Sequence, residues 1–340
     1  MGSLKIGKTN FRPGTKSIFS VPVTKDLCGD ITIDTHVITG KYDGPTLLLL
    51  SMLHGTEWLS VLILRELVRL IDPGKLRGNV IAIPVANPPA MLSNTRNVLD
   101  NSDDPDANRA FGGKHQWINN QITNTIENKF FKITDNLIDY HMSGWGYSMA
   151  DISHSENYPD ERISEASKNM ALAYGVPIVH VRDADLKSRR SVGYGALKYG
   201  IAGISGGIGG VGFDQEREKS WLERNVNGTM NVMRYLDMLD GETTYCEKYL
   251  IVKGYWRASP LKGGLFQPLI GFERQYSVIK KGEPLAKIIC PQTFHTIEEI
   301  ESPGEGVLFY ISRQRMIRPG GWGYGIANTE TGQSYWIDGK

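Results

Sequence analysis

Two histidines and one glutamate lie along the chain where metal ligands would be expected. His54 and Glu57 belong to the segment HGTE, directly after the apolar run Pro45–Leu53, and His141 ends a second apolar segment, LIDYH. A histidine and a carboxylate three residues apart, on a turn that leaves a buried strand, can converge on one cation. Zinc in hydrolytic sites usually takes three protein ligands and keeps a fourth position for water. These residues therefore predict metal-activated hydrolysis.

Neighbouring residues support this arrangement. Gly55 gives the turn between the two ligands its backbone freedom, and Asp139, two residues before His141, can hold a ligand from behind by a hydrogen bond. The HxxE spacing alone is a weak signal, but HxxE after one strand with DxH at the end of another is much more specific. The remaining histidines have no such context, and we expect surface or buried structural roles for them: His36, His115, His154, His180 and His295.

Strand and helix patterns alternate through the first two thirds of the chain. Apolar strand-like runs are expected at 45–53, 79–85, 136–141 and 200–205, and helical spacing at 58–71, 116–132, 164–174, 189–198 and 216–239. Such alternation predicts an α/β domain with a mixed, largely parallel sheet flanked by helices. Sheets of this kind place ligands at the carboxyl ends of their strands, where HGTE and DYH both lie.

The composition changes near Gly241. Beyond this point the sequence consists of short strand-like segments with frequent Gly and Pro and without helical spacing. We therefore predict a catalytic domain over residues 1–242 and a β-rich C-terminal domain over residues 243–340.

Bulk properties exclude several classes of protein. The 340 residues carry a net charge of +1, with 40% hydrophobic and 22% charged residues, which gives no general attraction to nucleic acid or acidic membranes. No apolar run approaches the roughly 18–20 residues that cross a bilayer. The three cysteines are far apart and form no CxxC pair, which argues against a disulfide framework and for a reducing cytoplasm.

Three motifs in this order resemble the succinylglutamate desuccinylase and aspartoacylase family, a branch of the zinc carboxypeptidase superfamily. The family carries HGxE, D-x-N-R-x-F and D-x-H, which here read HGTE, DANRAF (106–111) and DYH (139–141). The resemblance covers nearly the whole chain. It implies one zinc ion per chain, held by His54, Glu57 and His141, and hydrolysis of an amide bond in a small N-acyl amino acid or a related substrate with a carboxylate.

The same resemblance assigns substrate-binding residues. Asn108 and Arg109 match the Asn-Arg pair that holds a substrate carboxylate, and a guanidinium offers a planar fork for that group. Arg96 matches an arginine near the metal that polarises the scissile carbonyl and stabilises the oxyanion. Arg189 and Arg190 are weaker candidates for a further anion contact, with a solvated face as the alternative.

One position departs from the family. Where the family has a catalytic glutamate, this chain has Gly207, in the segment GIAGISGGIGG. That glutamate takes a proton from the metal-bound water and passes it to the leaving amine. Glycine can do neither, and loss of a general base commonly costs about 10²–10⁴ in rate. Either the chain is an inactivated hydrolase, or another base such as Glu216 or Glu218 acts, or the protein binds ligand and metal without hydrolysis. The intact motifs favour the first.

A zinc enzyme of another reaction type, such as a ring-opening hydrolase or a lyase, is the alternative to amide hydrolysis. The glycine run 206–212 does not predict a nucleotide site, because it lacks the residues of a P-loop.

In the C-terminal domain, Tyr276 or Glu273 are candidates to reach the active site. The aromatic tail Trp322–Trp336 is assigned to packing or to a contact between copies of the chain.

Overall fold

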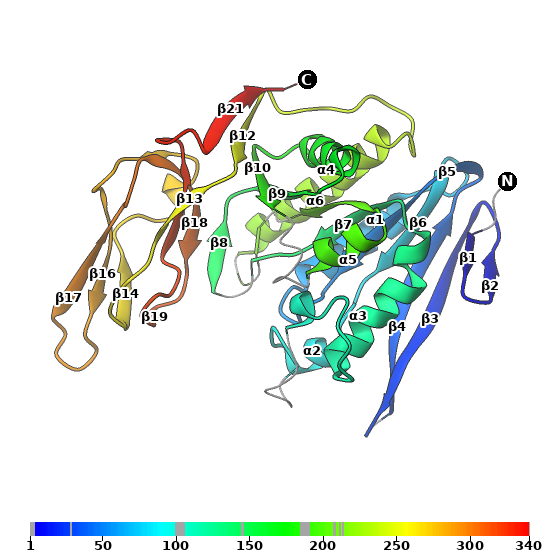
Figure 1. Ribbon diagram of the computed structural model, residues 1–340, viewed down its shortest axis with the longest axis horizontal. Coiled ribbons are helices and arrows are strands. Elements are labelled where there is room, and N and C mark those ends of the chain that lie inside the picture. The colour runs from blue at the N-terminus through cyan, green and yellow to red at the C-terminus, as the bar shows by residue number, and fades with distance from the viewer. Residues whose placement is uncertain are drawn as a thin grey trace.

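A ten-stranded sheet forms the body of the protein (Figure 1). The computed structural model describes residues 4–27, 29–98, 106–143, 146–183, 191–206, 209–210, 212 and 214–339. The ten strands are β3 (Thr15–Asp26), β4 (Gly29–Thr39), β5 (Tyr42–Ser51), β6 (Arg77–Ile83), β7 (Asn136–Tyr140), β9 (Ile152–Asn157), β10 (Ile178–Asp183), β11 (Ala202–Gly206), β12 (Lys248–Val252) and β21 (Ser334–Asp338). Their order across the sheet is β21-β12-β10-β9-β11-β7-β5-β6-β4-β3.

The sheet is mixed, as the sequence predicts. Five neighbouring pairs run parallel, in the centre and toward β12, and four run antiparallel, at the two edges and between β9 and β11. Strands β12 and β21 belong to this sheet although they follow residue 243. The division into 1–242 and 243–340 stays a prediction.

Helices cover both faces of the sheet (Figure 1). They are α1 (Leu59–Leu70), α2 (Pro88–Ser93), α3 (Ile118–Lys129), α4 (Glu161–Ala173), α5 (Val192–Lys198) and α6 (Gln215–Tyr235). Helices α1, α4 and α6 pack in one apolar cluster against one face, and α3 and α5 pack in a second cluster against the other.

Strand β5 shows why the predicted run of leucines is continuous rather than alternating. Leu47 and Leu49 point into the cluster with α1, whereas Leu48 and Leu50 point into the cluster with α3. All four are fully buried. A strand with helices on both sides needs apolar residues at every position, and its carboxyl end then delivers the HGTE turn at a fixed place.

The C-terminal part adds two antiparallel sheets, drawn from yellow to red in Figure 1. Their strands are β13 (Tyr255–Ala258), β14 (Gly264–Pro268), β15 (Val278–Ile279), β16 (Pro284–Ile289), β17 (Thr296–Glu301), β18 (Gly306–Ser312), β19 (Met316–Ile317) and β20 (Tyr324–Asn328). Within the described residues 243–339 there is no α-helix, only a 3-10 turn at Phe272–Arg274, in agreement with the predicted β-rich composition. A short strand from the first part of the chain, β8 (Tyr147–Met149), pairs with β18.

Several elements were not predicted: α2 and the strands β8, β9 and β10. Strand β9 reads Ile-Ser-His-Ser-Glu-Asn, and this polar composition hides a strand that is nevertheless almost wholly buried. The hairpin of β1 (Leu4–Ile6) and β2 (Thr9–Phe11) lies beside the main sheet. No helix in the described part of the chain has both the length and the apolarity that crossing a bilayer requires.

Candidate metal centre and active site

The first two predicted ligands lie on one turn between β5 and α1. His54 and Glu57 are fully and almost fully buried, and the amide of Glu57 donates to the carbonyl of His54 at 3.2 Å, which closes the turn. This turn brings His54 Nδ1 to 2.9 Å from Glu57 Oε1. The i,i+3 spacing in the sequence thus becomes a direct side-chain contact.

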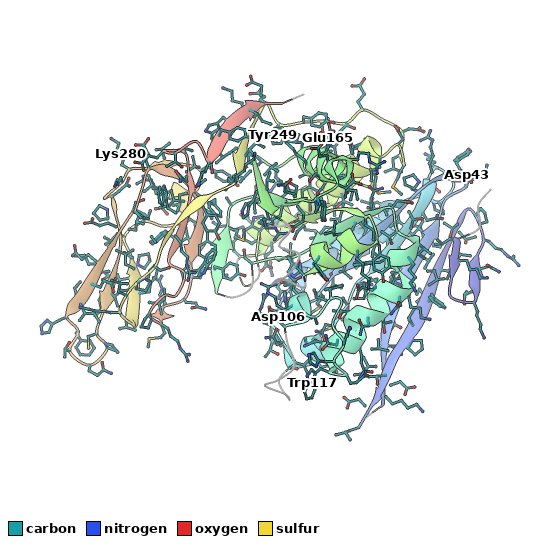
Figure 2. All side chains as sticks on the ribbon, in the orientation of Figure 1. Asp43, Asp106, Trp117, Glu165, Tyr249 and Lys280 are labelled. Atoms are coloured by element: carbon teal, nitrogen blue, oxygen red, sulfur yellow. The ribbon has the colours of Figure 1, made fainter. Side chains whose placement is uncertain are left out.

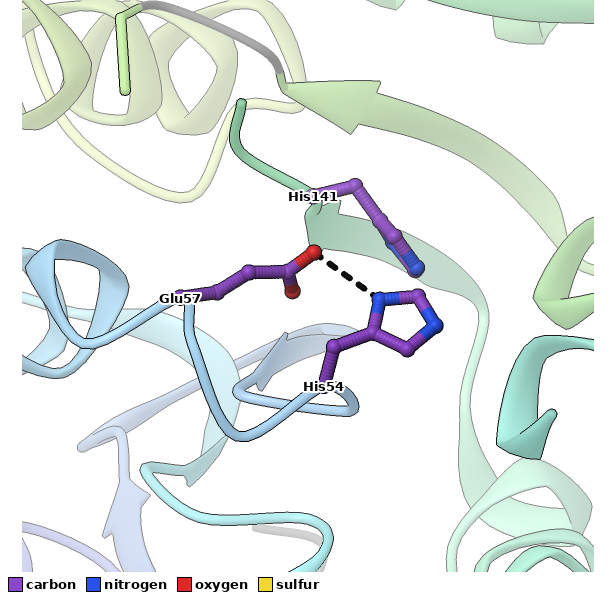
Figure 3. A group of neighbouring side chains, drawn as sticks. All are labelled: His54, Glu57 and His141. Atoms are coloured by element: carbon purple, nitrogen blue, oxygen red, sulfur yellow. Dashed lines mark hydrogen bonds and ion pairs between the residues drawn. The ribbon is translucent and has the colours of Figure 1, made fainter. Parts of the chain in front are cut away.

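The third predicted ligand approaches from β7. His141 follows the last residue of that strand, and its ring lies edge-on to that of His54 with 4.8 Å between the centroids. Asp139 Oδ2 lies 2.5 Å from His141 Nδ1, the contact that the sequence analysis expected of this aspartate. One ligand atom from each of the three side chains lies within 4.8 Å of the others (Figure 3).

Two polar atoms in this cluster are buried without a hydrogen-bond partner among the described residues. They are Glu57 Oε2 and His141 Nε2. Leaving such groups unpaired in the interior is costly, and both belong to the three side chains that converge. Two imidazole nitrogens with one carboxylate are a donor set that suits zinc. The residues present therefore fit a divalent cation.

Asp106 is one of the site residues whose role sequence reasoning missed. Its Oδ1 lies 2.9 Å from His54 Nε2, on the ring edge opposite Glu57, and its Oδ2 accepts from Arg96 Nε and Nη2 at 3.0 and 2.9 Å. In Figure 2 Asp106 lies between the helical layers and the C-terminal sheets, whereas Asp43 and Lys280 lie at the periphery. The signal was present, because Asp106 opens the D-x-N-R-x-F motif.

The electrostatics of the cluster favour positive charge. Burial alone would lower the pKa of His54, but the carboxylates of Glu57 and Asp106 outweigh burial and raise it from 6.5 to about 9. Burial would raise the pKa of Glu57, yet the imidazoles of His54 and His141 hold it below its usual value. A bound cation would meet the same demand in place of the proton.

A pocket of about 170 Å³ opens beside this cluster. Glu57, His141 and Arg96 line this pocket, and so do Asn108 and Arg109 from the segment after Asp106. Asn108 is fixed because its Oδ1 accepts from the amide of Val192 at 2.9 Å. No acidic side chain in the described part of the chain pairs with Arg109, which is exposed and donates to the carbonyl of Asn108.

Polar residues from the unpredicted strands form a further part of the pocket lining. His154 and Glu156 on β9 and Arg182 on β10 line it, together with Tyr147 on β8. Glu156 Oε1 lies 2.5 Å from Arg182 Nη2. A signal for these residues was the alternation in β10, where Val179 and Val181 face one helical layer and the alternating polar residues His180 and Arg182 face the other way.

Comparison with known proteins identifies the family of the chain. The profile described as the succinylglutamate desuccinylase/aspartoacylase catalytic domain matches residues 43–235, which is more than half of the chain. The chain belongs to this family. The match includes all three candidate metal ligands and the D-x-N-R-x-F segment.

One curated relative of the chain is the N-alpha-acetyl-L-2,4-diaminobutyric acid deacetylase of Halomonas elongata. The two sequences are 22% identical over 228 residues. The match covers 65% of this chain and 64% of the relative, so the chain spans less than two thirds of the relative's length.

Solved structures share the fold over almost the whole chain. The succinylglutamate desuccinylase/aspartoacylase of Rhodobacter sphaeroides has a TM-score of 0.79 at 19% identity, with 92% of this chain and 95% of that chain covered. A succinylglutamate desuccinylase from a Silicibacter species has a TM-score of 0.80 at 20% identity, with 96% and 100% covered. The product-bound ectoine utilization protein EutE (DoeB) of Ruegeria pomeroyi has a TM-score of 0.79 at 20% identity, with 93% and 97% covered.

The other residues that the sequence singled out either lie outside the described residues or do not line the pocket. Gly207, Arg189 and Arg190 lie outside the described residues, as does Cys28. Glu216 and Glu218 lie at the start of α6 and do not line the pocket.

Neither candidate from the C-terminal part lines the pocket either. The Tyr276 hydroxyl accepts from the amide of Asp151 at 2.6 Å, and Glu273 accepts from the amide of Gly271. Cys246 and Cys290 are free thiols, as the spacing of the cysteines suggested.

Proposed function

We propose that this chain is a zinc-dependent hydrolase of the family, built to remove the acyl group from a small N-acyl amino acid. The observation that carries the proposal is the pair of buried atoms Glu57 Oε2 and His141 Nε2, which have no hydrogen-bond partner among the described residues and lie beside His54 Nδ1. The family membership supplies the reaction class. The Halomonas relative, a deacetylase by name, supports an N-acylated amino acid as the substrate.

The metal ligands and the residues around Asp106 each have a place in this proposal. Zinc bound by His54, Glu57 and His141 would lower the pKa of a bound water and polarise a carbonyl. Arg109 and Asn108 would hold the substrate carboxylate, because the Arg109 guanidinium faces the pocket without an acidic partner among the described residues. Arg96 would stabilise negative charge on the carbonyl oxygen, and Asp106 fixes its position.

In this sequence, Gly207 occupies the position of the family's proton-transferring glutamate, so that carboxylate is missing. We therefore propose an inactivated hydrolase whose binding site is retained. The second candidate function, which the same glycine favours, is a metal and ligand-binding protein without hydrolysis.

A metal measurement tests the centre. The purified chain, loaded with zinc and dialysed, should retain about one zinc ion per chain, and His141→Ala should retain almost none. His295→Ala, which changes an exposed histidine of the C-terminal part, serves as the matched control and should keep the metal. Equal zinc contents in both variants would refute the assigned ligands.

Restoring the missing carboxylate tests the reaction. Gly207→Glu should raise the deacylation rate on a panel of N-acyl amino acids by about 10²-fold or more, the contribution of a general base. If the panel binds to the zinc-loaded protein but the variant gains nothing on any member, the binding function replaces the hydrolase.

A further inference from the structure

The pocket lining contains a charged pair, Glu156 and Arg182, that the proposed reaction does not use. Glu156 and Arg182 are opposite one another in the parallel register of β9 and β10, with 2.5 Å between carboxylate and guanidinium. Their side chains are 11% and 32% exposed. Both line the main pocket and its smaller extension beneath.

Two glycines lie beside the pair, and one of them permits a close backbone approach to Glu156. Gly203 on β11 lines the extension, and a Cβ at Gly193 would come within 3.0 Å of Glu156 Cγ. The start of α5 therefore packs closely against Glu156, and the open volume that the pair borders is the main pocket, which both side chains line. A carboxylate and a guanidinium bordering open space are available for recognition.

The pair also lies next to the residues assigned to the substrate carboxylate. The Asn108 side chain accepts from the amide of Val192, and the next residue, Gly193, lies against Glu156. A carboxylate held at Asn108 and Arg109 therefore places its own α-carbon near this pair. The substituent of the α-carbon that points toward Glu156 and Arg182 is then the substrate's side chain, because the acyl group must point toward the metal ligands.

The charges of the pocket balance in pairs. Arg96 is neutralised by Asp106 and Arg182 by Glu156, while Arg109 alone has no acidic partner among the described residues. Burial, with Arg182 nearby, holds the pKa of His154 well below its usual value, so this neighbour adds no charge. Within the described lining, the pocket thus offers one cation without an acidic partner for a substrate carboxylate, and a neutral ion pair for the rest of the substrate.

We propose that Glu156 and Arg182 form the subsite for the substrate's side chain and select a neutral group that both donates and accepts hydrogen bonds, such as a carboxamide. A carboxamide NH₂ can donate to the Glu156 carboxylate while its oxygen accepts from the guanidinium. A side chain with a single charge meets a like charge at one member of the pair and must disrupt the ion pair to bind. The inference rests on the proposed function, since it assumes an N-acyl amino acid in the pocket.

Binding to the zinc-loaded chain tests this subsite without requiring turnover. Titration calorimetry is performed with N-acetylglutamine, N-acetylglutamate, N-alpha-acetyl-2,4-diaminobutyrate and N-acetylnorvaline. We expect N-acetylglutamine to bind tightest. Glu156→Gln should improve N-acetylglutamate about tenfold relative to N-acetylglutamine, and Arg182→Gln should improve the diaminobutyrate ligand by a similar factor. Glu283→Gln, which changes a carboxylate 2.9 Å from Arg274 in the C-terminal part, is the control and should change no preference.

The outcomes separate the subsite from the proposed function. If ligands bind but both variants change all four affinities by the same factor, or if a charged ligand binds the unaltered chain tightest, the subsite is refuted and the function stands. If no N-acetyl amino acid binds the loaded chain, both are refuted. Should a variant fail to fold, a crystal structure of the unaltered chain with N-acetylglutamine decides. The carboxamide must then lie within hydrogen-bond distance of Glu156 and Arg182.

Discussion

His54 Nε2 lies 2.9 Å from Asp106 Oδ1, on the ring edge that faces away from Glu57. The second oxygen of the same carboxylate holds Arg96. One aspartate therefore fixes both a candidate metal ligand and the arginine assigned to the carbonyl oxygen. Because the three side chains form one connected unit, a change at Asp106 should act on metal and substrate together.

Replacing Asp106 with asparagine tests this coupling. The amide oxygen can still accept from His54 and from the amide of Asn108, but it cannot neutralise Arg96 or strengthen the imidazole as a ligand. We expect zinc affinity to fall about 10–100-fold, as for other residues that support metal ligands. Competition with a chromophoric chelator measures the affinity. Asp160→Asn, at the exposed N-terminus of α4, is the control, and a loss of equal size there would contradict the assignment.

The metal-free protein should lose stability as the pH rises. The pKa of His54 lies at about 9 in the folded chain and at 6.5 without its partners. A group with a raised folded pKa contributes stability that is complete below the unfolded pKa and is lost as the pH rises through the folded one. The metal-free chain should therefore weaken between pH 6.5 and about 9, by up to about 3 kcal/mol.

Bound zinc should remove this dependence, because the imidazole then ligates the metal in its neutral form. Urea unfolding at pH 6, 7.5 and 9, with zinc or with a chelator, distinguishes the two forms. An identical decline in both would show that His54 is not the group responsible.

Gly55 is required by a close approach between two segments. A Cβ at this position would lie 1.8 Å from the carbonyl oxygen of Ala90 in α2, so Gly55→Ala must displace the HGTE turn. We expect a loss of about 1–3 kcal/mol in unfolding free energy together with reduced zinc content. Gly203→Ala is the matched control, because its Cβ would meet Leu137 at an ordinary 3.5 Å. Unchanged metal content in the Gly55 variant would refute the requirement.

The C-terminal part should influence ligand binding through β8. This strand pairs with β18, and the rings of Tyr147 and Tyr310 are 5.1 Å apart. Tyr310→Ala removes the ring that supports Tyr147 in the pocket wall, so N-acyl amino acids should bind about three- to tenfold more weakly while zinc content stays the same. Tyr335→Ala, an exposed tyrosine on β21, should change neither quantity. Equal ligand affinity in both variants would contradict the link.

Much of the fold was accessible from local patterns. The leucine run that became β5 and the helical spacing that became α1 were predicted within a few residues, because both are long and strongly periodic. Strands β9 and β10 were missed, since their polar residues face a pocket rather than solvent. A buried polar strand has the composition of a loop, and only the packing of its neighbours distinguishes the two.

The sequence by itself predicted the candidate metal ligands and determined the family, because HGTE, DANRAF and DYH are local signals whose chemistry depends on residue type and spacing. Tertiary structure alone decided that Asp106 reaches His54 across 52 positions and that Glu156 meets Arg182 in the pocket. Such pairs follow from strand order and register, which bring together residues far apart in the chain. No local spacing encodes that proximity.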